Sequence, residues 1–237
     1  MKESRNDRLF TMASGAIMLF MCALIIYPLY FMLIASLSSP EYVLSGQVVF
    51  WPKGLNLEGY KRILNYDMLW TGYANSMFYS VVGAILSTSL TLMAAYPLSR
   101  ADFSGRRFLS LFFLFAMFFQ GGLIPQYILV NQLHLRNTYW VLLCVSGIQV
   151  MNLLMASSYF RSTYLPSLYE AAEIDGCAHF GYFFRVLLPT STPIIIVMLL
   201  FYGVWQWNDY FRAMIYLDKE QYYPIQLVLK ELLASNQ

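Results

Sequence analysis

Long apolar runs without any charged residue alternate with short polar segments along this chain of 237 residues. A helix that crosses a bilayer needs roughly 20 mostly apolar residues. Five uncharged runs reach that length, at 9–37, 72–98, 108–130, 138–160 and 190–208. Each run is too long for a core strand, and we therefore expect five membrane-spanning helices.

Two of these runs carry residues that disturb a helix. Gly121, Gly122 and Pro125 interrupt the third run, and Pro193 lies near the start of the fifth. The first run is followed by small residues at 35–38, as in a secretory signal peptide. Because it is far longer than a signal core of about 7–15 residues, we expect it to be a retained span.

Composition agrees with this pattern. The chain is 59% hydrophobic and only 12% charged, whereas soluble proteins carry about 25% charged residues. The apolar excess must face lipid, which predicts an all-α membrane protein built as a polytopic helix bundle. The net charge is only +2, and the chain has no Lys/Arg-rich block, so nucleic acid is excluded as a partner.

The distribution of Lys and Arg predicts the topology. Positive charge concentrates in short cytoplasmic loops, and the segment 99–107 holds Arg100, Arg106 and Arg107 within nine residues. With the N-terminus inside, segments 1–8, 99–107 and 161–189 are cytoplasmic. Segments 38–71 and 209–237 are then extracytoplasmic, and we expect 38–71 to fold partly against the mouths of the spans.

Several kinds of chemistry have no sequence signal. The five runs hold no ionisable relay of the kind that proton- and ion-coupled carriers keep at membrane depth. The chain has no GxxxxGK[ST] phosphate loop, no HExxH and no GxSxG. Its three cysteines lack metal-ligand spacing. We therefore predict no cofactor on this chain and no catalytic residue.

Neutral polar side chains do occur in the runs. They can join helices by hydrogen bonds, or they can line a path for an uncharged, hydroxyl-rich solute. The first interpretation is favoured for any single residue, and the second makes all of them candidates for a translocation path: Asn75, Gln120, Gln126, Gln149, Asn152 and Gln206.

All five tryptophans fall on the predicted outer side, at positions 51, 70, 140, 205 and 207. An aromatic belt at the lipid headgroups explains this placement, and stacking against a sugar at the outer mouth is the alternative. The bias to one side does not decide strongly between the two interpretations.

The segment 170–189 holds the densest cluster of acids in the chain, EAAEIDGCAHFGYFFRVLLP. Ser167 and Glu170 have the spacing of a capping box that starts a helix, and Gly176 can end it in a left-handed conformation. Interfacial helices favour Lys and Arg on their polar face, so a short acidic helix indicates docking to a cytoplasmic protein. His179 is interpreted as an ordinary surface or packing histidine.

This segment resembles the cytoplasmic signature E-A-A-x-x-x-G-x(9)-I-x-L-P of permease subunits of bacterial ABC importers. Val186 stands where isoleucine is usual, and Cys177 replaces the commoner alanine. Two further stretches, GGLIP at 121–125 and WND at 207–209 followed by YPIQLVLKELL, resemble sugar permeases of the maltose-importer type, nearest to the oligosaccharide-permease subgroup. The residues that match the signature, together with the aspartate typical of the carbohydrate branch, are Glu170, Ala171, Ala172, Asp175, Gly176 and Pro189.

The resemblance covers nearly the whole chain, and it implies a type I ABC importer permease fold over residues 1–237 as a single transmembrane domain. The segment 161–189 would be the coupling-helix loop, seated in a cytoplasmic ABC ATPase dimer that binds ATP and Mg²⁺. A second homologous permease and an extracytoplasmic solute-binding protein would be the other partners. The protein would lie in the bacterial plasma membrane and conduct a sugar or oligosaccharide.

Permeases of this family usually have six spans, so we expect a sixth span that the 237 residues do not include. Two other functions stay open from the residues alone. One is a membrane enzyme acting at the outer face, where Asp209 and Arg212 look more like a loop-closing pair than an acid–base pair. The other is an assembly subunit that conducts nothing.

Overall fold

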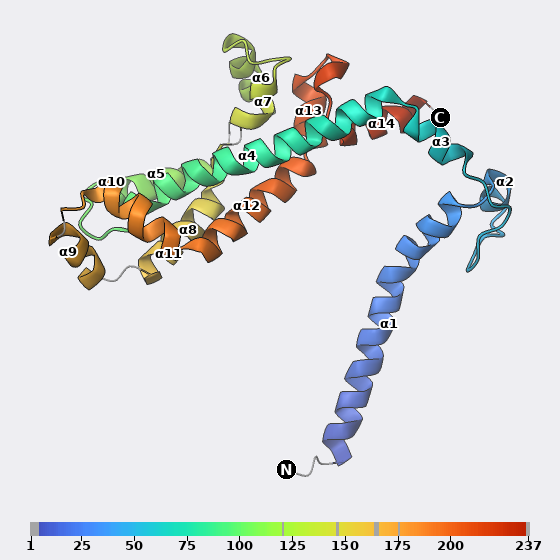
Figure 1. Ribbon diagram of the computed structural model, residues 1–237, viewed down its shortest axis with the longest axis horizontal. Coiled ribbons are helices and arrows are strands. Elements are labelled where there is room, and N and C mark those ends of the chain that lie inside the picture. The colour runs from blue at the N-terminus through green and yellow to red at the C-terminus, as the bar shows by residue number, and fades with distance from the viewer. Residues whose placement is uncertain (1–4, 120, 146, 164–165, 175, 236–237) are drawn as a thin grey trace. The chain divides into compact units, whose positions relative to one another are not determined.

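The computed structural model describes residues 5–119, 121–145, 147–163, 166–174 and 176–235 (Figure 1). These residues form helices and no β-strand, and a single isolated bridge pairs Ser38 with Leu55. The chain divides into two compact units, residues 1–66 and 67–237. The expected all-α architecture is present, and each unit is considered by itself.

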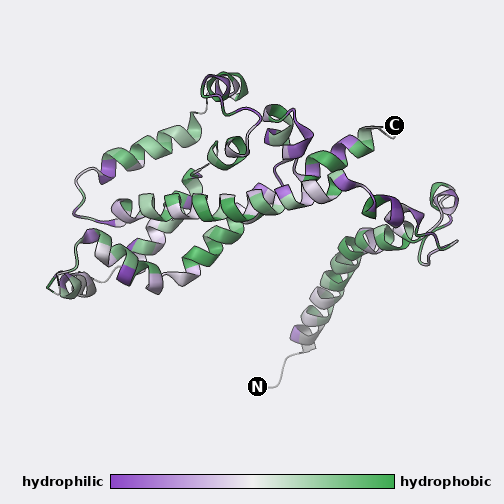
Figure 2. Cartoon of the chain, turned by 45° about the horizontal axis from the view of Figure 1, so that its top comes forward, coloured by the Kyte–Doolittle hydropathy of each residue, from purple (hydrophilic) through white to green (hydrophobic). Residues whose placement is uncertain are grey.

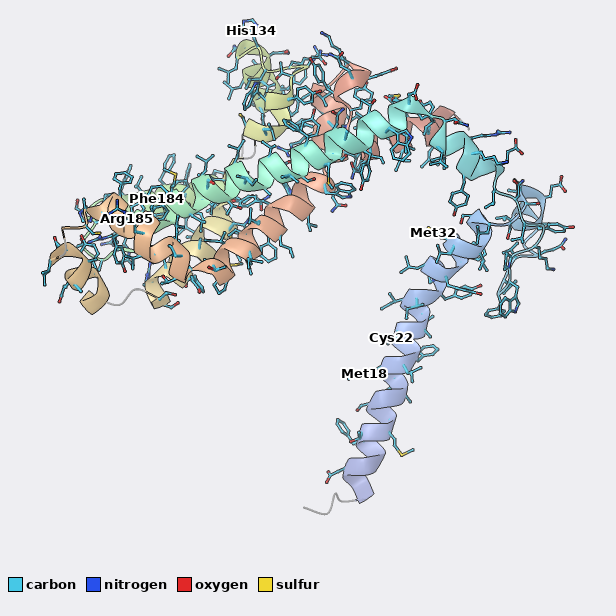
Figure 3. The ribbon with its side chains drawn as sticks, in the orientation of Figure 1. Met18, Cys22, Met32, His134, Phe184 and Arg185 are labelled. Atoms are coloured by element: carbon cyan, nitrogen blue, oxygen red, sulfur yellow. The ribbon has the colours of Figure 1, made fainter. Side chains whose placement is uncertain are left out.

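The first unit is dominated by α1 (Arg5–Ser36), followed by α2 (Pro40–Leu44) and α3 (Glu58–Leu64). Residues Phe10–Ser36 of α1 are long and apolar enough to span a membrane, in agreement with the first expected span. Side chains such as Met18, Cys22 and Met32 project from α1 without burial (Figure 3). An apolar helix exposed on all sides has the surface expected of a helix in lipid.

The segment after α1 folds back on that helix. The Tyr27 hydroxyl donates to the Val49 carbonyl at 3.3 Å, and the Tyr30 hydroxyl donates to the Phe50 carbonyl. The Ser38 hydroxyl caps α1 through the Ile34 carbonyl at 2.6 Å. These bonds support the expectation that 38–71 folds partly against a span mouth.

The second unit begins with α4 (Asp67–Ser99) and α5 (Arg106–Phe118). Its remaining elements are α6 (Leu123–Gln132), α7 (Tyr139–Cys144), α8 (Val150–Thr163), α9 (Pro166–Ile174), α10 (His179–Tyr182), the π-helix Phe183–Leu187, α11 (Leu188–Thr190), α12 (Thr192–Trp207), α13 (Tyr210–Tyr216), the 3-10 helix Glu220–Tyr222 and α14 (Ile225–Ser235). In Figure 1, α9 and α10 lie at one end of α4, and α13 and α14 lie at the other.

Helix α4 is the centre of this unit, and α8 and α12 pack along it. Its buried face carries small side chains, which let neighbouring helices approach closely. A Cβ built on Gly83 would lie 2.4 Å from Nε2 of Gln206 on α12, so only glycine fits there. The other small residues of this face are Ser76, Ser80, Ala84, Ser87, Thr91 and Ala95.

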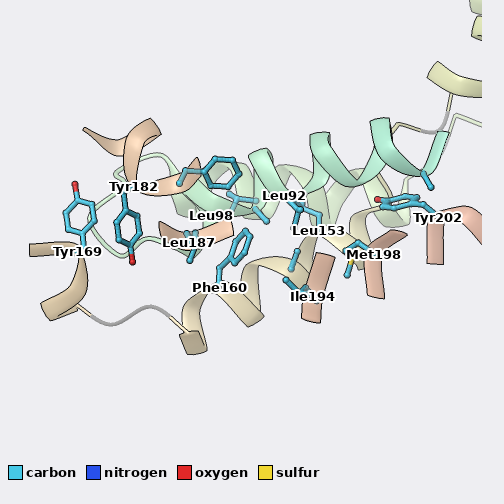
Figure 4. Close-up of a cluster of buried hydrophobic side chains, with 14 residues drawn as sticks. Leu92, Leu98, Leu153, Phe160, Tyr169, Tyr182, Leu187, Ile194, Met198 and Tyr202 are labelled. Atoms are coloured by element: carbon cyan, nitrogen blue, oxygen red, sulfur yellow. The ribbon is translucent and has the colours of Figure 1, made fainter. Parts of the chain in front are cut away.

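A buried apolar cluster fills the space between α4, α8 and α12 and continues to α9 and α10 (Figure 4). Leu153, Phe160, Met198 and Tyr202 are fully buried in it. Tyr202 closes the cluster at one end and Tyr169 at the other, as Figure 4 shows. One continuous core therefore joins the middle of the bundle to the short helix α9.

The third and fourth expected spans are not continuous helices. The third is divided into α5, which ends at Phe118, and α6, whose N-cap residue Gly122 takes φ +81°. The fourth is divided into α7 and α8, and Gly147 lies in the connection. The interruption expected at Gly121–Pro125 in the run 108–130 is thus present, whereas the break within 138–160 was not predicted, because apolar composition does not report a local break in the backbone hydrogen bonds.

Among the described residues, two helices alone are long and apolar enough to cross a membrane, Phe10–Ser36 and Asp67–Ser99. Two bent pairs pass the same test only when both helices of a pair are taken together, α5 with α6, and His179–Thr190 with α12, which meet at 82°. The expected number of five spans is therefore not confirmed. Figure 2 shows green hydrophobic residues dominating α4 and α12, with purple hydrophilic residues gathered mainly in connections.

Candidate functional site

The short helix α9 carries the acidic signature and ends as the sequence predicts. Gly176 takes φ +78°. Its amide donates to the Glu173 carbonyl at 3.0 Å, and the Cys177 amide donates to the Ala172 carbonyl at 2.8 Å. These two bonds form a Schellman motif, which closes a helix around a left-handed glycine. The predicted glycine stop is confirmed.

The predicted start of this helix is different. Helix α9 begins at Pro166, so Ser167 lies inside its first turn rather than at the N-cap. Proline is favoured at the first helical position, because its missing N–H would have no helical partner there. The capping box centred on Ser167 was therefore wrong about the helix boundary. The side chain of Ser167 and residue Asp175 lie outside the described part of the chain.

Helix α9 presents most of its side chains to the surface. Glu170, Ala171, Glu173 and Ile174 are exposed, with Ile174 at 86%. Only Tyr169 is buried among the described side chains of the helix, while Ala172 is half-buried against the core. Glu170 and Ala171 thus lie on the exposed face with Ile174 as its apolar tip, whereas Ala172 faces the core. Pro189 is exposed on α11, just before the bend into α12.

Arg100, at the end of α4, contacts this site from beneath. Its side chain is 7% exposed. The guanidinium donates to both carboxylate oxygens of Asp102 at 2.9 and 2.5 Å, and to the Tyr96 hydroxyl at 3.0 Å. The same group lies 4.1 Å from the centre of the Tyr169 ring and 2.9 Å from Nδ1 of His179. Four side chains therefore surround one buried cation.

The positive charge of Arg100 and the negative charge of Asp102 stabilise each other. The hydrogen bond from Arg100 holds the pKa of Asp102 below its ordinary value, and the bond to Asp102 raises the pKa of the Arg100 guanidinium. A bidentate pair between a guanidinium and a carboxylate is the strongest ion-pair geometry that side chains make. His179, interpreted from the sequence as an ordinary surface or packing histidine, is exposed and also packs, since its ring contacts both Arg100 and Tyr169.

Two of the six candidate path residues join helices. The Asn75 amide donates to the carbonyls of Gln221 and Tyr223 at 2.9 and 3.0 Å. The Gln206 amide donates to the Leu142 carbonyl at 3.1 Å, and its oxygen accepts from Arg212 at 2.8 Å. Both side chains are buried and tie an apolar helix to its neighbours. These bonds favour the structural interpretation for both residues.

The other four candidates are placed differently. Asn152 is 5% exposed, and its Nδ2 has no hydrogen-bond partner among the described residues. Gln149 is half-buried, with its backbone N–H donating to the Tyr202 hydroxyl at 3.0 Å. Gln126 is exposed on α6, and Gln120 lies outside the described residues. Asn152 and Gln126 keep free polar atoms, and a role for these residues in a path stays a prediction.

At the opposite end of α4, Asp209 and Arg212 form an ion pair, and each is only 12% exposed. Asp209 caps α13 through the Arg212 amide, while the Arg212 guanidinium stacks 4.2 Å from the Trp205 ring. Burial lowers the pKa of Arg212, and Asp209 opposes that shift. With this contact, Trp205 has a partner within the chain.

Sequence reasoning missed Arg100, Tyr96 and Tyr169 as members of the site. Arg100 counted only as a positive charge of a cytoplasmic loop. One signal was available, because Tyr96 and Arg100 are four residues apart and so share a helix face. No comparable signal links Arg100 to Tyr169 and His179, which are distant in the sequence.

The chain is similar to several bacterial proteins, although no protein-family model matches it. Permease protein YtcP of a polygalacturonan/rhamnogalacturonan transport system from Bacillus subtilis strain 168 is 35% identical over 228 residues, 96% of this chain and 79% of that protein. Protein LplC of the same strain is 32% identical, over 98% of this chain and 78% of LplC. An arabinooligosaccharides transport system permease, AraQ of Halalkalibacterium halodurans, is 29% identical, over 91% of this chain and 78% of AraQ.

A solved structure has the same fold. It belongs to a bacterial ABC transporter involved in the import of the acidic polysaccharide alginate. The superposition has a TM-score of 0.94 at 29% identity, covering 100% of this chain and 84% of the matched chain. The expected permease fold is confirmed. Because the relatives are transport permeases, the hypothesis of a membrane enzyme is set aside.

Proposed function

Because the chain belongs to the permease family of ABC transport systems for sugars and oligosaccharides, we propose that it forms half of a path through which an oligosaccharide is imported. A second homologous permease supplies the other half, and an extracytoplasmic solute-binding protein delivers the solute. A separate ABC ATPase dimer, which binds ATP and Mg²⁺ on the cytoplasmic side, drives the cycle. The protein lies in the plasma membrane with its N-terminus in the cytoplasm.

The observation that carries the proposal is the geometry of α9. A helix of nine residues ends in a left-handed glycine, exposes Glu170, Ala171, Glu173 and Ile174, and is anchored through Tyr169. Ile174, at 86% exposure beside two exposed carboxylates, leaves both an apolar group and charged groups open to a partner protein. We assign this face to a cleft of the ATPase, so that α9 acts as the coupling helix.

The solute class follows from the relatives and from the bundle. The names of YtcP and of the alginate importer refer to polysaccharides. The predicted path residues are neutral amides, which suit a hydroxyl-rich solute better than a small ion. Because the name of YtcP refers to polygalacturonan, fragments of that anionic polymer are tested first, beside a neutral oligosaccharide, which the amides suit better.

Replacement of Gly176 tests the coupling role. Nothing lies within 4 Å of a Cβ built on Gly176, so the first atom of a side chain meets no neighbour, although φ +78° strains any residue other than glycine there. We expect Gly176→Trp to reduce uptake at least tenfold, because the indole blocks the ATPase cleft. The measurement is uptake of a labelled polygalacturonan digest, together with the amount of ATPase that co-purifies with the permease.

Two smaller substitutions separate bulk from backbone strain. Asparagine accepts the left-handed conformation, whereas alanine is strained there by about 1 kcal/mol without adding bulk. We expect Gly176→Asn to stay within about threefold of wild type, with Gly176→Ala between the two. Uptake by Gly176→Trp at the wild-type rate, or a wild-type complex without any ATPase, would contradict the proposal. An assembly subunit is distinguished by ATP hydrolysis that does not respond to the solute.

A further inference from the structure

Arg100 links two elements that are far apart in the sequence, the end of α4 and the short helix α9. Its guanidinium lies over the Tyr169 ring at 4.1 Å and reaches Nδ1 of His179 at 2.9 Å. A planar guanidinium can stack on a ring while its edge donates hydrogen bonds, which a lysine ammonium cannot do. Arg100 therefore holds both residues at once.

The hydrogen bonds fix the roles of the partners. An arginine side chain only donates, so Nδ1 of His179 must be an acceptor in this contact. The Tyr169 hydroxyl lies 2.8 Å from the same nitrogen, and the two rings are parallel within 9°. Tyr169, His179 and Arg100 thus form a closed triangle that spans α4, α9 and α10.

Among the described side chains of α9, Tyr169 and the half-buried Ala172 are the ones that contact the core. Tyr169 is its only buried side chain among those described, and it packs edge-on against Tyr182 at 5.1 Å between ring centres. Figure 4 shows Tyr169 and Tyr182 side by side at the end of the core. Among the described side chains of α9, Tyr169 therefore offers the buried contact through which a force on the exposed face can reach the core, beside the backbone itself and the half-buried Ala172.

We infer that Arg100 is a positioning residue that locks α9 to α4, so that a displacement of α9 moves α4 with it. The inference rests on the proposed function, because it gives the coupling helix a mechanical link to the longest helix of the bundle. Tyr169 immediately precedes the signature residue Glu170, so the lock lies at the base of the face assigned to the ATPase. Asp102 and Tyr96 hold the guanidinium in place from the α4 side.

A cavity of about 380 Å³ opens beside the cluster, lined by Met93, Tyr96, Arg100, Asp102, His179 and Phe180 among others. A shorter side chain at position 100 would enlarge this cavity and overlap with no neighbour. This makes Arg100→Gln and Arg100→Lys suitable variants, since they change the contacts of the side chain without filling occupied space.

The first experiment measures solute transported per ATP hydrolysed by the complete complex in proteoliposomes, with a polygalacturonan digest and the solute-binding protein. We expect Arg100→Gln to keep ATP hydrolysis within about twofold and to lower transport per ATP at least fivefold. Arg100→Lys keeps a cation near the Tyr169 ring. Its loss of transport per ATP should be about half that of Arg100→Gln on a logarithmic scale. Tyr169→Leu should match Arg100→Gln, and Tyr169→Phe, which keeps the ring, should resemble Arg100→Lys.

The second experiment needs no transport. Hydrogen exchange of the α9 amides is measured in the purified complex, and we expect at least tenfold faster exchange in Arg100→Gln. Arg107→Gln is the matched control, because it removes the same charge at an exposed position nearby in the sequence, in the first turn of α5. Its exchange and its transport per ATP should equal wild type.

The outcomes separate this lock from the proposed function. Wild-type transport per ATP and wild-type exchange in Arg100→Gln overturn the lock. If Arg100→Gln prevents assembly, Arg100→Lys and Tyr169→Phe decide, and wild-type behaviour of both also overturns it. If the wild-type permease binds no ATPase and Arg100→Gln still speeds the exchange of the α9 amides, the lock is supported and the proposed function is contradicted.

Discussion

Asp102 and Arg100 form one ion pair in two environments, since the Asp102 side chain is 62% exposed and that of Arg100 is 7% exposed. Exposed ion pairs contribute between about 0 and 1 kcal/mol, and removing one partner of a buried pair costs more because the other charge is left unpaired. We expect Asp102→Asn to destabilise the detergent-solubilised protein by about 1 kcal/mol at neutral pH. Thermal unfolding followed by size-exclusion chromatography measures this difference.

The pH dependence of that difference follows from the direction of the shift. The folded-state pKa of Asp102 is lowered by Arg100, so its contribution is present above the unfolded-state pKa and is lost as pH falls through the folded-state pKa. The gap between wild type and Asp102→Asn should be constant from about pH 8 to about pH 5 and shrink below about pH 4. A gap that widens on acidification would contradict the assigned ion pair.

Single residues differ in how far the sequence predicts them. The stop at Gly176 is a local event, because a left-handed glycine and two backbone bonds suffice. The cluster around Arg100 depends on a contact between positions 79 residues apart. No periodicity or spacing reports such a contact, so the sequence indicated the short acidic helix but not the arginine that contacts its Tyr169.

At the scale of elements, the fit between α4 and α12 depends on one glycine. An alanine at position 83 would push on Gln206, whose amide is bonded to the Leu142 carbonyl. Overpacking of this kind costs about 1–3 kcal/mol. We expect Gly83→Ala to lower the midpoint of thermal unfolding in detergent by several degrees.

Gly203 on α12 gives the matched control. A Cβ there would lie 3.8 Å from the Cβ of Ala84, an ordinary contact. Alanine also favours a helix interior over glycine by about 1 kcal/mol. Gly203→Ala should therefore be neutral or stabilising, and equal losses from the two substitutions would show that helix packing at Gly83 is not the cause.

Helix breaks were the part of the fold that the sequence predicted least well. Gly121, Gly122 and Pro125 were visible inside the third run, yet a glycine or proline can also lie within a continuous membrane helix. The break between α7 and α8 has a weaker signal, a single Gly147. The Tyr202 hydroxyl accepts a hydrogen bond from the Gln149 backbone N–H at that break, and nothing in the sequence indicates this contact. Composition therefore predicts that a segment is apolar and helical, and tertiary contacts decide where it bends.

At the scale of the whole second unit, the two ends of α4 have different chemistry. One end carries Arg100 and the contacts to α9, and the other carries Asn75 and Ser76, which bond the segment around α14. The elements expected in the cytoplasm and those expected outside therefore lie at opposite ends of one helix (Figure 1). A helix of 33 residues at about 1.5 Å per residue is long enough to separate them by a bilayer.

This arrangement leads to a test of the orientation of α4 in the membrane. That orientation is so far argued from the positive charges of the short loops. Single cysteines are placed at Ser104, beside Arg100, and at Lys219, before α14, in a chain whose Cys22, Cys144 and Cys177 are replaced by alanine. Both positions are exposed, so each thiol can react with a membrane-impermeant maleimide. In right-side-out vesicles we expect Lys219→Cys to be labelled at least tenfold faster than Ser104→Cys.

Inside-out vesicles should reverse that order, because the same maleimide then reaches the Arg100 end of α4. The pair controls for thiol reactivity, since each cysteine is compared with itself on the two sides. Labelling of Ser104→Cys from the outside would place α9 in the extracytoplasmic space, where no ATP-driven partner can bind it. The orientation of α4 thus decides whether the face of α9 can couple to an ATPase at all.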